Sequence, residues 1–173
     1  MEAISETDRL VLDRSTDAYV RFQPASWDRF DLQGTGTGWP PSKALILLEV
    51  NCQENPLGSK LTLCMGPGSD AAIRERLWNS AIRNPHLFKT SGSLGDWNPQ
   101  LLRDPVALLT EEDLGLAWDD GRATERIRGR FSRFFEERLP AIDEIITACF
   151  ETEPRSESNH DPIPPPSDSE TSA

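Results

Sequence analysis

The chain has 173 residues and a formal net charge of −11. This length predicts one domain, and the acidic charge disfavours DNA or anionic membranes as partners of the protein as a whole. No apolar run approaches the ~20 residues that span a membrane, and the polar N-terminus does not resemble a secretory signal peptide. The three cysteines are scattered and predict no disulfide framework, so we expect a cytoplasmic protein.

The predicted elements begin after a polar segment, residues 1–17, which we expect to be flexible. Residues 18–22, AYVRF, alternate apolar and polar side chains and predict the first strand. Ser26 is the expected N-cap of a short helical turn that directs Trp27 and Phe30 toward the core.

Residues 44–68 contain the strongest strand signal. The apolar runs ALILLEVNCQ and KLTLCMGPG flank a short segment that carries Pro56 and Gly58, which predicts a β-hairpin at the centre of an antiparallel sheet. The glycine-rich segment before it, QGTGTGWPP at residues 33–41, has no GK[ST] after it. It therefore predicts a connection anchored by Trp39 rather than a phosphate-binding loop.

An amphipathic helix is expected directly after the hairpin. Ser69 is its predicted N-cap, and the helix runs to about Arg83. Arg74, Glu75 and Arg76 fall on its solvent side. Its buried stripe recurs at helical spacing and comprises Ile73, Leu77, Trp78 and Ala81.

The pattern is weaker in the stretch that follows, where residues 86–90 are a candidate strand. Thr110 is the expected cap of a short helix over residues 111–118. A longer helix is predicted over residues 121–138, and another over residues 140–149. The core stripe of the longer helix comprises Ile127, Phe131, Phe134 and Phe135.

Together these elements predict an α+β domain over residues 18–150. An antiparallel sheet built on the central hairpin is expected to be covered by two or three helices. From residue 151 onward proline, serine and acidic residues dominate, and apolar residues nearly vanish. Such a segment cannot bury enough surface to offset its ordering entropy, so residues 151–173 are a predicted disordered acidic tail.

Few residues offer catalytic or metal-binding chemistry. The two histidines, His86 and His160, are too few for a histidine-based zinc site, and the chain has no GxSxG motif. Asp31 and Glu49 are similar to the paired carboxylates with which some nucleases hold a divalent cation. However, Asn51 stands two residues after Glu49, where such a site carries a lysine. We therefore expect no catalytic residue, no metal and no cofactor.

A stripe of arginines is the main candidate for binding. Arg122, Arg126 and Arg130 are spaced by four residues and line up on one face of the predicted helix. The stripe predicts either a contact surface for phosphate or an acidic partner, or a set of intrahelical ion pairs. The acidic residues available for such pairs are Asp119, Asp120, Glu125, Glu136 and Glu137. The predicted contact residues are Arg122, Arg126, Arg130, Arg133, Arg74 and Arg76.

Several short motifs follow one another in a characteristic order: YVRF, LTLCMGPG, IRERLWNSA, LFK and FSRFFEERLPAIDEII. This order resembles the C-terminal region of bacterial PD-(D/E)XK nuclease family proteins, with the matching stretches at residues 61–77 and 131–145. The resemblance covers roughly residues 18–148. It implies an accessory domain, without the catalytic domain, from a family linked to DNA cleavage and to phage defence.

These observations lead to three hypotheses. The first is a non-catalytic accessory or binding module that contacts DNA or a nuclease partner. The second is an acidic inhibitor protein that occupies the nucleic-acid groove of another protein. The third is a degenerate metal-dependent nuclease built on Asp31 and Glu49.

Overall fold

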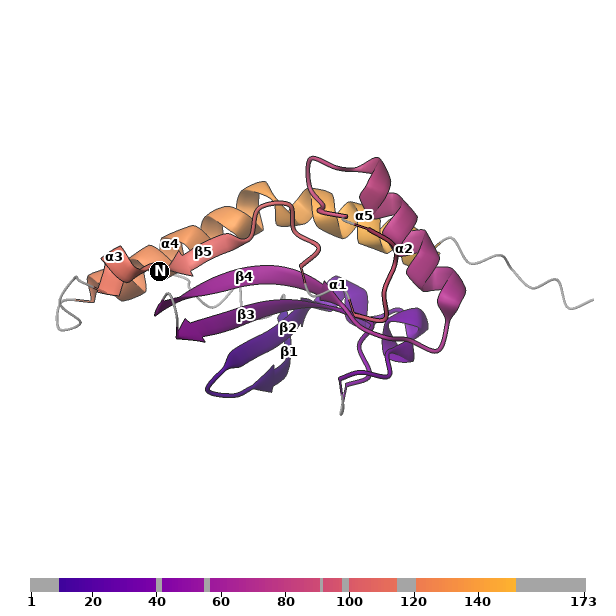
Figure 1. Cartoon of the computed structure of the whole chain (residues 1–173), viewed down its shortest axis with the longest axis horizontal. Coiled ribbons are helices and arrows are strands. Elements are labelled where there is room, and N and C mark those ends of the chain that lie inside the picture. The colour runs from indigo at the N-terminus through magenta and orange to yellow at the C-terminus, as the bar shows by residue number, and fades with distance from the viewer. Residues whose placement is uncertain are drawn as a thin grey trace, which may run out of the picture.

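The computed structural model describes residues 10–39, 42–54, 57–90, 92–97, 100–114 and 121–151. Five antiparallel strands form one sheet in the order in which they follow along the chain, and helices lie along one side of it (Figure 1). The strands are β1 (Leu10–Ser15), β2 (Tyr19–Pro24), β3 (Ile46–Glu54), β4 (Leu57–Met65) and β5 (Val106–Leu109). The helical elements are α1 (Ala25–Asp28), η2 (Asp31–Thr35), α2 (Ala71–Arg83), α3 (Glu111–Leu114), α4 (Arg122–Glu137) and α5 (Leu139–Glu151). The predicted α+β class is confirmed.

The central hairpin is formed by β3 and β4, as predicted. Its register pairs Ile46 with Met65 and Val50 with Leu61, so side chains of like polarity share a face. The strands are buried on both faces because two clusters flank them. The larger cluster lies toward the helices, and the smaller one consists of Trp39, Ala44, Leu47 and Cys64.

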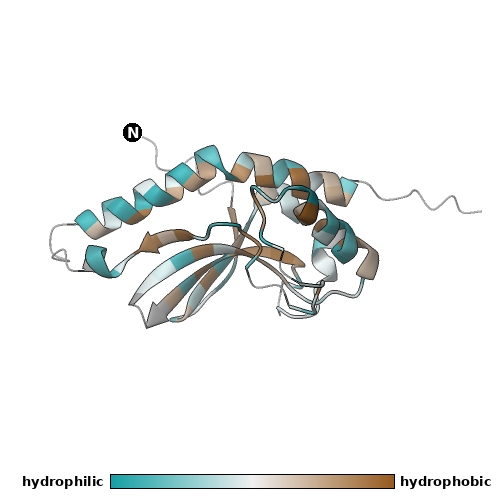
Figure 2. Cartoon of the chain, turned by 45° about the horizontal axis from the view of Figure 1, so that its top comes forward, coloured by the Kyte–Doolittle hydropathy of each residue, from teal (hydrophilic) through white to brown (hydrophobic). Residues whose placement is uncertain are grey.

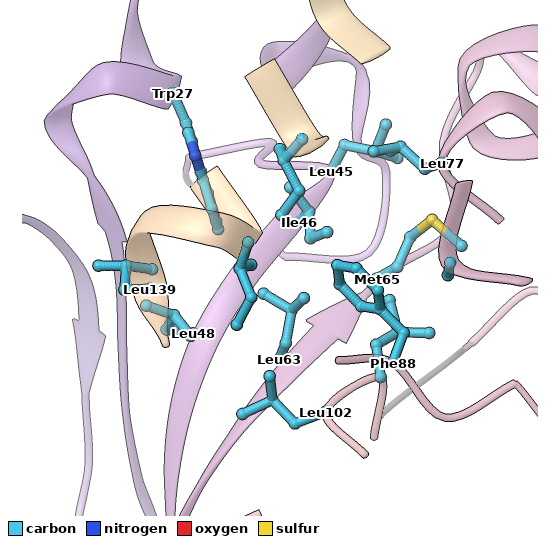
Figure 3. Packing of buried hydrophobic residues seen from close by; sticks show 14 of the residues in the cluster. Trp27, Leu45, Ile46, Leu48, Leu63, Met65, Leu77, Phe88, Leu102 and Leu139 are labelled. Atoms are coloured by element: carbon cyan, nitrogen blue, oxygen red, sulfur yellow. The ribbon is translucent and has the colours of Figure 1, made fainter. Parts of the chain in front are cut away.

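The larger cluster is the core of the domain. Figure 3 shows side chains of β3 and β4, such as Leu48 and Leu63, meeting Trp27 of α1 and Leu139 of α5. Trp27 is completely buried, and its Nε1 donates to Asp143 Oδ1 on α5 at 2.6 Å. The polar atom of this large side chain is therefore paired inside the apolar cluster.

Helix α2 carries the predicted stripe of buried residues, with Trp78 only 8% exposed. Its N-cap, however, is Asp70 rather than Ser69. The Asp70 carboxylate accepts from the backbone N–H groups of Ala72 and Ile73, whereas Ser69 Oγ donates to the carbonyl of Thr35. A carboxylate at this position also interacts favourably with the helix dipole.

Helices α4 and α5 run one after the other along the sheet (Figure 1). Figure 2 shows that α4 is largely hydrophilic, while hydrophobic residues concentrate in the strands and in α5. The predicted core stripe of α4 is confirmed, because Phe134 is buried and Ile127, Phe131 and Phe135 pack against the core. Phe131 and Phe135 both contact the ring of Phe22 on β2.

Several predicted boundaries are wrong. Residues 10–15 form β1 instead of belonging to the flexible N-terminus, and their short apolar run LVL is satisfied by pairing with β2. Residues 86–90 form a turn with a single bridge between Phe88 and Leu102 rather than a strand. Ser26 lies inside α1 and donates to Asp143, so it is not the N-cap of this helix.

Two further predictions concern residues outside the described part of the chain. The tail predicted over 151–173 falls there except for Glu151, which is the last residue of α5, and so does the second half of the helix predicted over 111–118. Among the described residues, no helix combines the length and apolar character that a membrane span requires.

Candidate binding surface on helix α4

The candidate binding surface is built around Asp113, a residue of the short helix α3. The sequence Thr110-Glu111-Glu112-Asp113 forms a capping box at the start of α3. Asp113 Oδ2 accepts from the backbone N–H of Thr110 at 2.9 Å and from its hydroxyl at 2.7 Å, and Thr110 Oγ1 accepts from the N–H of Asp113. The Asp113 side chain is 0% exposed. A buried carboxylate is thus held in place by its own helix turn.

Two arginines of α4 neutralise this carboxylate. Arg126 Nη1 donates to Asp113 Oδ1 at 2.7 Å, and Arg130 donates to both oxygens, with Nη2 3.2 Å from Oδ1. Arg130 Nη1 also donates to the carbonyl of Leu108 on β5 at 3.0 Å. These bonds join α3, α4 and β5, which is the last strand of the sheet.

The two guanidinium groups control the charge state of Asp113. The hydrogen bonds from Arg130, then those from Arg126 and Thr110, hold the pKa of the Asp113 carboxyl far below its usual range. Asp113 is therefore ionised in the folded protein at neutral pH. Two guanidiniums against one carboxylate leave this cluster with a net positive charge.

This pairing differs from the intrahelical ion pairs considered from the sequence. Within the described residues, the side chains of Glu125, Glu136 and Glu137 form no ion pair with α4 arginines. Asp119 and Asp120 lie outside the described residues. The partner of Arg126 and Arg130 is Asp113, which the sequence analysis missed. The spacing of Thr110 and Asp113 was the signal available in the sequence.

The arginine surface, as we call Arg122, Arg126, Arg130 and Arg133, follows one side of α4. Arg126 exposes 44% of its side chain and Arg130 exposes 31%. Arg126 uses Nη1 on Asp113, and no described residue accepts a hydrogen bond from its Nη2 or Nε. Arg122 and Arg133 are exposed one turn before and two turns after Arg126. The exposed guanidinium of Arg126 is thus held in a fixed orientation between two further cations.

Arg74 and Arg76 do not belong to this surface. Arg74 Nε donates to the carbonyl of Gly66 at 3.1 Å, and its Nη2 donates to those of Gly95 and Asp96. Arg76 Nη1 donates to the carbonyl of Cys149 near the end of α5 at 2.8 Å. Both side chains are half-buried rather than on the solvent side of α2. Both arginines therefore link α2 to backbone carbonyls of other segments.

The carboxylates of the nuclease hypothesis are not brought together as a metal centre. Glu49 lies on the sheet face away from the main core, where Arg21 Nε donates to its Oε2 at 2.7 Å. Asn51 Nδ2 donates to the other oxygen at 3.4 Å. Asp31 begins η2 and is exposed. The described residues contain no group of three or more His, Cys, Asp and Glu side chains arranged to hold a metal ion.

Other reactive side chains occupy ordinary structural positions. Cys64 is buried in the smaller cluster, and burial raises the pKa of its thiol well above the usual range. It therefore remains a protonated thiol at neutral pH. His86 is exposed in the turn after α2.

Comparisons with known protein families, curated proteins and solved structures gave no match to this chain. The resemblance to the PD-(D/E)XK nuclease family stays a prediction from its short motifs.

Proposed function

We propose that the chain is a non-catalytic binding module that contacts DNA through the arginine surface of α4. The observation that carries this proposal is the state of Arg126. Its guanidinium is 44% exposed, yet a fully buried carboxylate fixes its orientation. A guanidinium with free N–H groups in a fixed position binds phosphate oxygens with little loss of side-chain entropy.

The neighbours of Arg126 support the same role. Arg122 and Arg133 lie along the same side of α4, so successive cations are about one to two helical turns apart. Because the whole chain carries a net charge of −11, a partner phosphate backbone gains attraction only at such a local positive surface. Binding should therefore be modest in strength and strongly dependent on salt.

The test is an anisotropy titration of labelled duplex DNA at several salt concentrations. In the variant R122E/R133E, two cations become anions while Asp113 keeps both of its partners. We expect affinity to fall at least about tenfold, equal to about 1.4 kcal/mol. The slope of log K against log salt should become shallower by about 2. Stability should change little, because both residues are exposed and the glutamate introduced for Arg122 would lie favourably in the first turn of α4.

The matched control is R103E/R128E. Both arginines are exposed, and Arg128 lies on α4 itself, but neither belongs to the arginine surface. The change in net charge is the same in both double variants. Equal loss of binding in the two would show that only net charge matters. Absence of DNA binding by the parent at every salt concentration would refute the proposal and favour the acidic-inhibitor alternative.

A further inference from the structure

The long helices α2, α4 and α5 lie on one side of the sheet (Figure 1), and side chains that alternate with the core residues form the opposite face. One cross-strand row of that face pairs Arg21 with Glu49, and the next row contains Tyr19, Asn51 and Lys60. Asn51 and Lys60 are exposed, and Tyr19 is half-buried. We call the side of the sheet that carries these five residues the open face.

A row of aromatic rings and one guanidinium crosses the open face. Arg21 Cζ lies 4.0 Å from the ring centroid of Tyr19 and 5.3 Å from that of Trp39. The Trp39 ring in turn meets Trp97 edge-on, with centroids 5.4 Å apart. Trp39 is 5% exposed and belongs to the smaller cluster, whereas Trp97 is 50% exposed. Trp97 is thus the solvent-exposed end of an aromatic row whose other members are packed.

Trp97 is held in place although its ring is exposed. Arg74 Nη2 donates to the two backbone carbonyls just before Trp97, at 2.6 and 2.9 Å. Trp39 supports the ring on one side. Gly38 leaves the space that the ring needs, because a Cβ there would lie 2.4 Å from Trp97 Cη2. A large aromatic side chain that is already fixed loses little conformational entropy when a partner packs against it.

The charge of the open face determines which partner its aromatic row fits. The carboxylate in these rows, Glu49, is only 9% exposed and is neutralised by Arg21 at 2.7 Å. Two exposed cations flank this pair: Lys60 lies in the next row, and Arg14 of β1 pairs with Arg21. No described carboxylate forms an ion pair with either cation. The exposed charge in these rows is therefore positive, which complements phosphate.

We propose that the open face binds single-stranded nucleic acid, with a base stacked on Trp97 and phosphates at Lys60 and Arg14. Stacking on an exposed ring needs an unpaired base, which a duplex does not offer. Trp39 lies against Gly66, just past the end of β4, and Lys60 lies about 20 Å back along this strand. Contacts this far apart require a strand of several nucleotides rather than a single nucleotide. The strand is either DNA or RNA.

This proposal does not rest on the arginine surface. Helix α4 packs on the other side of the sheet, where Phe131 and Phe135 contact Phe22 of β2. Phe22 points away from its neighbour Arg21, because successive residues of a strand face opposite sides. The arginine surface offers phosphate contacts, which a duplex satisfies, whereas the open face requires an unpaired base. The two proposals can therefore fail separately.

The test is an anisotropy titration of the full chain with labelled oligothymidylate and oligouridylate of about ten nucleotides, and with duplex DNA. We expect at least one single strand to bind. Trp97→Ala should weaken this binding at least about tenfold and leave the affinity for duplex DNA unchanged. Binding of only one of the two single strands identifies DNA or RNA as the preferred ligand. Absence of duplex binding would refute the proposal for the arginine surface and leave this one intact.

Two conservative variants distinguish stacking from an apolar contact. Trp97→Phe keeps an aromatic ring and should retain most of the affinity for the single strand, whereas Trp97→Leu keeps only apolar bulk and should lose it. The control Ile82→Ala removes an apolar side chain of similar exposure, 49%, from α2. It should leave binding unchanged.

A second pair of variants tests the phosphate contacts. Lys60→Gln should weaken binding of the single strand and make the slope of log K against log salt shallower by about 0.7. The control Arg128→Gln removes one exposed cation from α4, on the other side of the sheet, and should leave this slope unchanged.

Thermal melting verifies that each variant is folded. If Trp97→Ala fails to fold, Trp97→Leu and Lys60→Gln decide the question. The proposal is refuted if neither single strand binds with a Kd below about 100 µM at low salt, or if Trp97→Ala binds both as well as the parent does. Equal affinities of the leucine and phenylalanine variants would also overturn it, and would favour a protein that makes an apolar contact with Trp97.

Discussion

The cluster of Asp113, Arg126 and Arg130 predicts that the effect of Asp113→Asn on the free energy of unfolding changes sign when both arginines are replaced. Replacing both arginines by glutamine removes both cationic partners of a carboxylate that is 0% exposed in the parent. Loss of the partners of a buried ion typically costs about 3–5 kcal/mol. Asp113→Asn alone should cost less, about 1.5–3 kcal/mol, because the released guanidiniums are already partly exposed and can bind water.

In the R126Q/R130Q background, Asp113→Asn removes the uncompensated buried charge. The same substitution that destabilises the parent should therefore be neutral or stabilising there. Urea denaturation at pH 7 measures all four proteins, and the coupling energy should exceed about 1.5 kcal/mol. The control R128Q/R133Q removes two exposed arginines that do not contact Asp113, and it should leave the cost of Asp113→Asn unchanged. An equal cost of Asp113→Asn in the parent and in R126Q/R130Q would refute the reasoning.

The same cluster predicts a pH dependence. The folded-state pKa of Asp113 is depressed by Arg130 and Arg126, so its contribution to stability is present above the unfolded pKa of about 3.9. It is lost as the pH falls further. The difference in unfolding free energy between the parent and Asp113→Asn should therefore shrink between about pH 5 and pH 2. A difference that stays constant over this range would show that Asp113 ionisation does not stabilise the fold.

Three further predictions concern packing and Arg74 of α2. Trp78→Ala should cost about 3–5 kcal/mol in urea denaturation, and a midpoint like that of the parent would show that the ring is not a core element. Gly36→Ala should destabilise by at least about 1–3 kcal/mol, because its Cβ would lie 2.1 Å from the carbonyl oxygen of Ala44. Gly34→Ala, where nothing lies within 4 Å, is the matched control, and equal melting temperatures would refute the clash. Arg74→Lys should destabilise by about 1–3 kcal/mol, since lysine cannot reproduce the fork that reaches three carbonyls. Full stability of the lysine variant would show that charge alone suffices.

Local patterns in the sequence were enough to predict the elements whose signals lie within a few neighbouring residues. The hairpin over residues 44–68 follows from two apolar runs around a turn, and the buried stripe of α2 follows from helical spacing. The alignment of Arg122, Arg126 and Arg130 on one face likewise follows from a spacing of four. Each of these depends on backbone periodicity, which a short window of sequence contains.

The tertiary structure alone decided what those side chains bind. Arg126 and Arg130 meet a carboxylate 13 and 17 residues earlier in the chain, and Trp27 pairs with Asp143 across 116 residues. The short strands β1 and β5 form because each pairs with a neighbouring strand, β1 with β2 and β5 with β4. Likewise, the sequence shows separate aromatic residues, and only folding places Trp39 between Arg21 and Trp97. Such contacts depend on which elements pack together and at what register, and spacing along the chain carries no information about that.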